Sequence, residues 1–115
     1  MPDTDCLFCR IVAGEIPAEV VHETATTLAF RDLSPQAPTH VLVIPRSHHR
    51  DAAALAADEP GTVADLVAAA AEVAATEGLG DGYRLVLNTG AEAGQTVFHV
   101  HLHLLGGRPM GWPPG

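Results

Sequence analysis

The sequence has few basic residues. Lys and Arg together number six in 115 residues, against 14 Asp and Glu, and the formal net charge is −8. Proteins that bind a long nucleic acid do so largely by neutralising its phosphates with Lys and Arg. We therefore do not expect a DNA- or RNA-binding protein. A single nucleotide, held by backbone N–H groups and hydroxyls, remains compatible with this charge.

Long apolar runs are missing as well. No stretch approaches the roughly 20 consecutive apolar residues that a membrane-spanning helix needs. Residues 1–5 are acidic, whereas a secretory signal begins with basic residues. Hydrophobic residues still make up 47% of the chain, which is typical of a folded protein. We expect one cytoplasmic domain with no membrane partner, because a chain of this length has little room for a second core.

Hydrophobic periodicity predicts an α+β fold with about five antiparallel strands and one main helix. Apolar residues recur at helical spacing from Val63 to Ala74, with Asp58 and Pro60 before them and Gly78 after them. The expected strands are short β-branched or apolar runs, several of them bounded by turn residues. They cover residues 20–22, 27–30, 41–44, 84–88 and 97–105.

Three histidines alternate with apolar residues near the end of the chain. In a strand, His99, His101 and His103 share one face. A solvated polar face would explain one exposed histidine, but three of the seven histidines on one face favour a chemical role. Neutral imidazole is a nucleophile, and its phosphoryl adduct is labile. Metal binding is the other interpretation, although a rise of about 3.3 Å per residue keeps all three rings from meeting at one ion.

A glycine-containing loop, residues 90–94, joins the last two expected strands. Such loops let backbone N–H groups approach a phosphate, and Asn88 and Thr96 add side-chain donors. Taken alone, the pattern is more typical of an ordinary hairpin loop. Its place beside the imidazoles favours a phosphate site.

Cys6 and Cys9 are the only cysteines, and their C-x-x-C spacing suits a metal site or a redox pair. A structural disulfide is not expected in a cytoplasmic chain, and a redox pair is expected in a thioredoxin-like unit after a strand. Two reduced cysteines packed as small apolar residues are the remaining alternative. We favour a metal, for which two thiolates need two further ligands, usually imidazoles.

The order of these motifs closely resembles the histidine-triad (HIT) superfamily over nearly the whole chain. The matching residues are Asn88, the Gly-Gln-Thr-Val of 94–97, the His-x-His-x-His run, residues 106–110 and 112–115, and, upstream, residues 30–45 and 16–18. The ending matches the Hint-like branch of purine nucleoside phosphoramidases. The resemblance implies one HIT domain over residues 1–115, a HIT-like fold joined into a two-fold homodimer, and residues 106–115 as a Gly/Pro-rich tail near the active site.

The resemblance also implies a hydrolase that cleaves the P–N bond of purine nucleoside phosphoramidates, such as adenylated amines or lysine. His101 would attack phosphorus and form a nucleotidyl-histidine, which water would then cleave. His103 would contact the phosphate and steady the leaving group, and His40 would complete the relay that holds the rings. No cofactor is needed for this chemistry.

The same resemblance implies a nucleotide-binding set. Asp32 matches the residue that holds the ribose hydroxyls, a task suited to a carboxylate, although it also fits a turn residue before Ser34. The other members would hold the phosphate or the base, and the apolar ones would otherwise be interpreted as core. They are Asn88, Gly94 and Thr96 for the phosphate, and Leu7, Phe8, Ile11, Phe30 and Leu33 for the base.

Some microbial histidine-triad proteins carry a zinc ion, which implies a structural Zn²⁺ here. The implied ligands are Cys6, Cys9, His48 and His99. His49 is the rival fourth ligand, and we expect His22 to be an ordinary surface or edge-strand histidine. In this interpretation His99 fixes the chain and takes no part in the chemistry.

Two rival functions remain. One is a dinucleoside-polyphosphate hydrolase of the same superfamily, a branch that lacks the ending of residues 106–115. The other is a non-catalytic nucleotide-binding adaptor. The retained His40, Asn88, His101 and His103 argue against the adaptor, because an adaptor need not keep the nucleophile.

Overall fold

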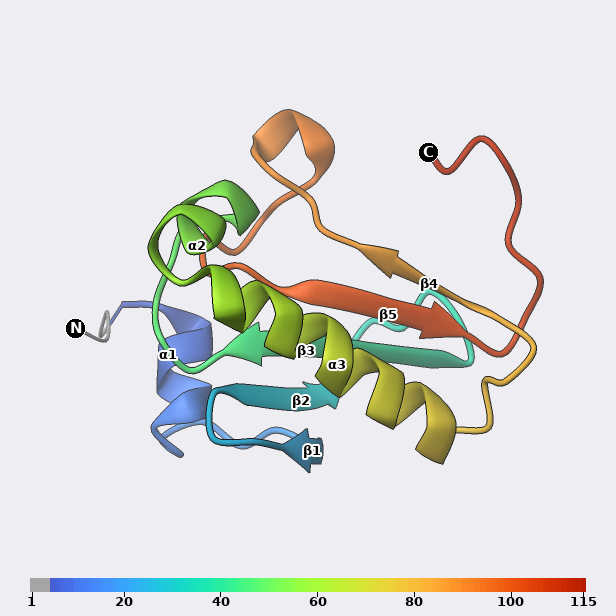
Figure 1. Cartoon of the computed structure of the whole chain (residues 1–115), viewed down its shortest axis with the longest axis horizontal. Helices are drawn as coiled ribbons and strands as arrows, with labels where there is room; N and C mark the ends of the chain where they lie inside the picture. Colours follow the sequence, from blue (N-terminus) through green and yellow to red (C-terminus); the bar gives the residue numbers. More distant parts are fainter. Residues whose placement is uncertain (1–4) are drawn as a thin grey trace.

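A computed structural model describes residues 5–115. Its centre is a five-stranded antiparallel sheet in the order β1-β2-β3-β5-β4 (Figure 1). The strands are β1 Val20–Glu23, β2 Thr27–Arg31, β3 Thr39–Pro45, β4 Tyr83–Val86 and β5 Leu102–Gly106. The α+β fold and the five-stranded sheet are confirmed. Residues 1–4, part of the acidic segment used above to judge the absence of a secretory signal, lie outside the described residues.

The main helix lies where the sequence predicts it. This helix, α3 Pro60–Thr76, begins with Pro at its first position, where the missing N–H costs no intrahelical bond. It ends just before Gly78, whose φ of +73° suits glycine. None of the helices in residues 5–115 is long and apolar enough to cross a membrane.

Two short helices were not predicted. α1 Leu7–Val12 and α2 Ala52–Asp58 have six and seven residues. Asp51 caps α2, because its carboxylate accepts a hydrogen bond from the N–H of Ala54 at 2.9 Å. Pro60 then separates α2 from α3, since the residue before a proline avoids the helical conformation.

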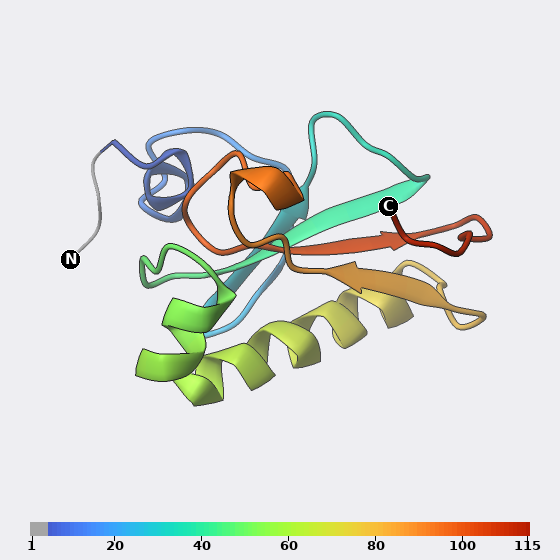
Figure 2. The same ribbon diagram turned by 90° about the horizontal axis from the view of Figure 1, so that it is seen from above.

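Helical segments and loops cover both faces of the sheet. α3 packs on one face, and Figure 2 shows α1 and the short 3-10 helix η1 Ala91–Ala93 on the other. Along β3, Val41 and Val43 join the core under α3, whereas Leu42 and Ile44 join the core under α1. All of β3 is therefore buried, which explains its continuous apolar run.

The predicted strand over residues 97–105 is wrong in its first half. β5 begins only at Leu102, and the strand predicted over 84–88 ends at Val86. The side chains still alternate between the two faces before the strand pairing begins. Val100 and Leu102 are buried under α3, while His101 and His103 lie on the other face. A hydrogen bond from the Val100 N–H to the carbonyl oxygen of residue 49, at 2.8 Å, holds this irregular backbone.

The C-terminal tail, residues 107–115, has no regular structure. Arg84 Nη2 donates to the Gly111 carbonyl oxygen at 2.7 Å, and Arg108 Nη2 donates to the Gln36 carbonyl oxygen at 3.0 Å. Trp112 is 84% exposed in the single chain. The proximity of the tail to the active site stays a prediction, as does the dimer.

Candidate active site and metal centre

Three histidines meet on the face of the sheet that α1 covers. His103 of β5 pairs with Leu42 of β3, and His40 lies two residues away on the same face. His40 Nε2 consequently lies 2.9 Å from His103 Nδ1. The ring of His101, just before β5, is centred 5.0 Å from that of His103. The structure thus brings together the three predicted catalytic residues.

Hydrogen bonds show which nitrogen of His40 and His103 carries the proton. The Gln36 N–H donates to His40 Nδ1 at 3.0 Å. Neutral His40 must therefore carry its proton on Nε2 and donate it to His103 Nδ1. The proton of neutral His103 is then on Nε2, an atom that is buried and has no hydrogen-bond partner within residues 5–115. Such a donor is destabilising unless a ligand accepts from it.

Burial keeps both rings neutral near pH 7. Burial, with smaller effects from the His101 and His40 rings, lowers the pKa of His103 to about 4. Burial also lowers the pKa of His40, against the opposing effect of Asp32, whose Oδ2 lies 3.5 Å from His40 Nε2. Neutral rings are what the hydrogen-bond chain from Gln36 to His103 requires.

His101 carries its proton on Nδ1, whereas His40 and His103 carry theirs on Nε2. Its Nδ1 lies 2.8 Å from the carbonyl oxygen of His99. Because a carbonyl oxygen only accepts, Nδ1 carries a proton, and in the neutral ring Nε2 keeps its lone pair. The Phe8 ring packs edge-on against His101 at 5.1 Å between centroids. A neutral imidazole held in this way can act as a nucleophile through Nε2.

A cavity of about 270 Å³ opens beside His101 and His103. Its wall contains nine of the residues that the sequence predicts for catalysis or nucleotide binding. They are Leu7, Phe8, Ile11, Phe30, Asp32, Leu33, Thr96, His101 and His103. The predicted His40, Asn88 and Gly94 do not line it. Asn88 lies beside Gly94, where a Cβ atom would come within 3.9 Å of Asn88 Nδ2.

Two predicted members of the wall need a qualification. Leu33 is 99% exposed, so it contributes only at the rim. Asp32 also serves the turn, because its Oδ1 accepts from the Ser34 N–H at 2.7 Å. The turn role of Asp32 is therefore seen in the structure, and its other oxygen faces His40; its contact with the ribose hydroxyls stays a prediction.

Sequence reasoning missed part of this wall. The other residues that line the cavity are Ile16, Pro17, Ala18, Glu19, Arg31, Leu42 and Val97. All of them except Glu19 lie in stretches that resemble the histidine-triad superfamily, which is the one signal that pointed to them. Most of these side chains are apolar, and the two charged ones, Glu19 and Arg31, bond to each other at 3.0 Å, so chemistry alone could not have marked them.

Cys6, Cys9, His48 and His99 form a second cluster, with donor atoms all within 4.8 Å of one another. Cys9 Sγ lies 3.3 Å from His48 Nδ1 and 3.5 Å from His99 Nδ1, and Cys6 Sγ lies 3.4 Å from His99 Nδ1. The two Nδ1 atoms are 3.2 Å apart. Tetrahedral zinc, with bonds of about 2.0 Å to nitrogen and 2.3 Å to sulfur, spaces its ligand atoms by roughly 3.3–3.8 Å. The donor spacing therefore fits a zinc ion.

The tautomer of His99 also fits a metal ligand. Its Nε2 lies 2.9 Å from the Pro45 carbonyl oxygen, so the proton is on Nε2 and the Nδ1 lone pair faces the cluster. The ring is fully buried, and burial lowers the pKa of His99 to about 4. A neutral, oriented imidazole facing two sulfur atoms is a typical zinc ligand.

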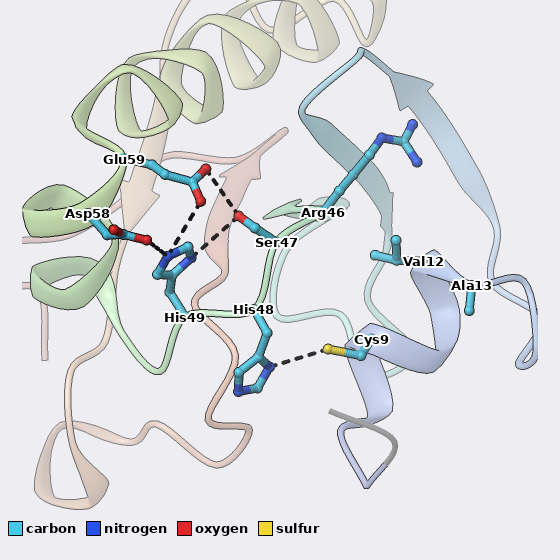
Figure 3. Close-up of a pocket in the computed structure, with 9 residues that line it drawn as sticks. All are labelled: Cys9, Val12, Ala13, Arg46, Ser47, His48, His49, Asp58 and Glu59. Carbon is cyan, nitrogen blue, oxygen red and sulfur yellow. Dashed lines mark hydrogen bonds and ion pairs between the residues drawn. The ribbon is translucent and has the colours of Figure 1, made fainter. Parts of the chain in front are cut away.

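His49, the rival fourth ligand, faces different partners. Figure 3 shows His48 turned toward Cys9 and His49 turned toward Asp58 and Glu59. His49 Nε2 lies 2.8 Å from Asp58 Oδ2 and 3.5 Å from Glu59 Oε2. The shorter distance is that of a direct hydrogen bond. His49 therefore anchors its loop to the junction of α2 and α3, apart from the cysteines.

Residues 13–110 match the family model of the HIT domain. An uncharacterized HIT-like protein of Synechocystis sp. is 51% identical over 111 residues, which cover 96% of this chain and 97% of that protein. A 14 kDa zinc-binding protein of Zea mays is 46% identical over 117 residues, which cover 100% of this chain and 91% of that protein. The chain belongs to the HIT domain family.

Solved structures agree with this assignment. A HIT family hydrolase from Legionella pneumophila Philadelphia 1 is 52% identical, with a TM-score of 0.91 over 96% of this chain and 99% of that one. A histidine triad nucleotide-binding protein from Candida albicans is 33% identical, with a TM-score of 0.82 over 94% of this chain and 82% of that one. The similarity extends through the sheet and its helices.

Proposed function

We propose that this protein hydrolyses the P–N bond of purine nucleoside phosphoramidates, with His101 Nε2 as the nucleophile. The observation that carries the proposal is the pairing of two nitrogens at one cavity. His101 Nε2 has a free lone pair, and His103 Nε2 has an N–H without a partner among the described residues. The first can attack phosphorus, and the second can donate to a phosphoryl oxygen or to the leaving nitrogen.

The reaction has two balanced steps. In the first, a bond forms between His101 Nε2 and phosphorus, the P–N bond to the amine breaks, and the amine nitrogen takes up a proton from solvent. In the second, a water oxygen bonds to phosphorus, the bond to Nε2 breaks, and water releases a proton. The His99 carbonyl oxygen, 2.8 Å from His101 Nδ1, orients the ring and stabilises the positive charge that develops on it.

The cavity wall supports a nucleoside as the rest of the substrate. Its apolar side, formed by Phe8, Ile11 and Phe30 among others, suits a flat purine base, and Asp32 offers a carboxylate to the ribose hydroxyls. Thr96 provides a hydroxyl for the phosphate. The solved relative named as nucleotide-binding supports the same class of ligand.

We further propose that Cys6, Cys9, His48 and His99 hold a structural Zn²⁺. The donor spacing, the tautomer of His99 and the zinc-binding relative from Zea mays support this proposal. Bound zinc would tie α1 to the segment that carries His101 and would contribute no group to the reaction. We also propose a cytoplasmic homodimer, whose mass in solution would be about twice that of the chain.

A substrate comparison tests the function. The kcat/KM of the zinc-loaded protein would be measured for an adenosine 5′-phosphoramidate with an amine leaving group and for a diadenosine polyphosphate. We expect a clear preference for the phosphoramidate. A preference for the diadenosine polyphosphate would favour the rival hydrolase. Nucleoside monophosphate binding without turnover of either compound would favour the adaptor, and either result would overturn the proposal.

A further inference from the structure

Gln95 is a buried polar residue in an exposed stretch of chain. Its relative exposure is 3%, whereas its neighbours Gly94 and Thr96 are exposed. Burying a carboxamide destabilises a protein unless its polar atoms are hydrogen-bonded. A glutamine placed inward at this point therefore needs partners, and the structure provides three.

All three partners of the Gln95 side chain are backbone groups. Oε1 accepts from the Gly90 N–H at 2.9 Å, and Nε2 donates to the carbonyl oxygens of Arg50 at 2.7 Å and Val97 at 3.1 Å. The Gln95 backbone N–H also donates to the Gly90 carbonyl oxygen at 3.1 Å. Residue 95 thus closes the loop that begins at Gly90 and ties it to two other segments.

These segments carry the groups of both sites. Val97 precedes His99 by two residues, and Arg50 follows His48 by two residues. The carbonyl oxygen of His49, one residue before Arg50, accepts the hydrogen bond from Val100 that holds the backbone between His99 and His101. Gln95 therefore fastens the loop 90–94 to the same short piece of backbone that supports the nucleophile.

Regular structure does not provide this link. Between the end of β4 at Val86 and the start of β5 at Leu102, η1 is the only regular element, and it has three residues. No ladder fixes the distance between Thr96 and His101 along this segment. Gln95 does not line the cavity, so it can act on a ligand only through the backbone that it holds.

We propose that Gln95 is a positioning residue that sets the loop 90–94 and Thr96 against His101 and thereby forms the site for the substrate phosphate. This inference rests on the proposed function, since it assigns a phosphate to that loop. The two parts of the ligand are then recognised by different parts of the chain. Phosphate recognition depends on Gln95, whereas base recognition by Phe8 and Phe30, which belong to α1 and β2, does not.

Two variants test the inference. Gln95→Met keeps the length of the side chain but removes all three hydrogen bonds, and Gln95→Asn keeps the carboxamide but shortens its reach by one methylene. Calorimetry would measure the Kd of adenosine 5′-monophosphate and of adenosine for each variant. Val73→Ala is the matched control, because Val73 lies on the buried face of α3 and its truncation lowers stability away from the cavity.

We expect Gln95→Met to weaken the binding of adenosine 5′-monophosphate about tenfold. This is the effect expected when the displaced loop loses a hydrogen bond to the charged phosphate. Adenosine affinity should change by less than about twofold, as for a site that keeps its contacts. Gln95→Asn should lie between wild type and Gln95→Met, with kcat falling in the same order. Val73→Ala should lower Tm without changing the ratio of the two affinities. Zinc content should remain that of the wild type in every variant.

Opposite results separate the two proposals. If the wild type bound adenosine 5′-monophosphate no better than adenosine and turned over no phosphoramidate, the proposed function would fail. If the wild type did both, and the soluble Gln95 variants kept its ratio of affinities, the role of Gln95 alone would be overturned. Should Gln95→Met be insoluble, Gln95→Asn decides by the same ratio.

Discussion

Two clusters of imidazoles lie next to each other on one face of the sheet, and they differ in what binds the far nitrogen of each ring. In the catalytic cluster, His40 donates to His103, whose own N–H has no partner within the described chain. In the cysteine cluster, His99 Nε2 donates a hydrogen bond to the Pro45 carbonyl oxygen, and Nδ1 of the same ring faces sulfur. The same side chain is therefore prepared as a donor in one cluster and as a metal ligand in the other.

The two clusters share structural supports. Phe8 of α1 packs against the rings of both His99 and His101, at 5.9 and 5.1 Å between centroids. The His99 carbonyl oxygen also orients His101. His99 thus belongs to the cysteine cluster through its side chain and to the catalytic cluster through its backbone. Two separate roles are therefore served by one segment of the chain.

The largest expected effect is on the nucleophile. We expect His101→Ala to lower kcat by at least about 10³-fold, since covalent catalysis is lost with Nε2. The Kd for adenosine 5′-monophosphate should stay within a few fold of the wild type, and zinc content should not change. Steady-state kinetics and calorimetry would measure both. His22→Ala, on the edge strand β1, is the control, and unchanged turnover in His101→Ala would refute the assignment.

The next largest effect is on the cysteine cluster. We expect Cys9→Ser to reduce bound zinc from about one ion per chain to near zero, because a closed four-ligand site has lost a thiolate. If the free energy of unfolding falls by about 2 kcal/mol with the metal, Tm should fall by roughly 10 °C in a domain of this size. Metal analysis of protein purified without added metal, and calorimetric unfolding, measure these changes. A wild-type stoichiometry near zero would contradict the zinc proposal.

A smaller effect concerns acid. The pKa of His103 is about 4 in the folded protein and near 6.5 when unfolded, so the unfolded state binds more protons at mildly acidic pH. Stability is thus retained above about pH 6.5 and lost as pH falls toward 4. We expect His103→Asn to reduce the fall in Tm between pH 7.5 and pH 5. An equal fall in wild type and variant would show that His103 is not held neutral.

The smallest effect separates His49 from the metal. We expect His49→Ala to leave zinc content unchanged and to lower stability by about 1 kcal/mol, the usual contribution of a hydrogen bond such as that to Asp58. Metal analysis beside His48→Ala, which should lose zinc, gives the contrast. Zinc loss in His49→Ala equal to that in His48→Ala would make His49 a ligand.

Patterns that depend on many residues were predictable from the sequence. α3 spans 17 residues with a clear apolar face, and β3 is a run of buried residues, so both were located. The short helices α1 and α2 were not, since six or seven residues make fewer than two turns and their order comes from caps and packing. The Asp51 cap was a visible signal for α2.

The histidine run shows where alternation misleads. Period-two spacing predicted a strand from residue 97, yet the ladder begins at Leu102. The spacing correctly predicted which face each side chain lies on, but wrongly predicted strand pairing before Leu102. The Val100 N–H donates to the carbonyl oxygen of His49 in a loop instead of to a neighbouring strand. The partners of His49 were equally beyond the sequence, and those of His48 followed from the resemblance and not from spacing. Adjacent identical residues differ only in where the backbone turns their side chains.

The shortness of α1 has a consequence for its motion. A helix of six residues does not persist by itself in water. Its order therefore depends on Cys6 and Cys9 at one side and on Phe8, buried against Phe30, at the other. When these contacts open, the amide hydrogens of α1 should exchange with solvent sooner than those of β3. Hydrogen exchange at α1 would then report local unfolding of the wall shared by the two clusters.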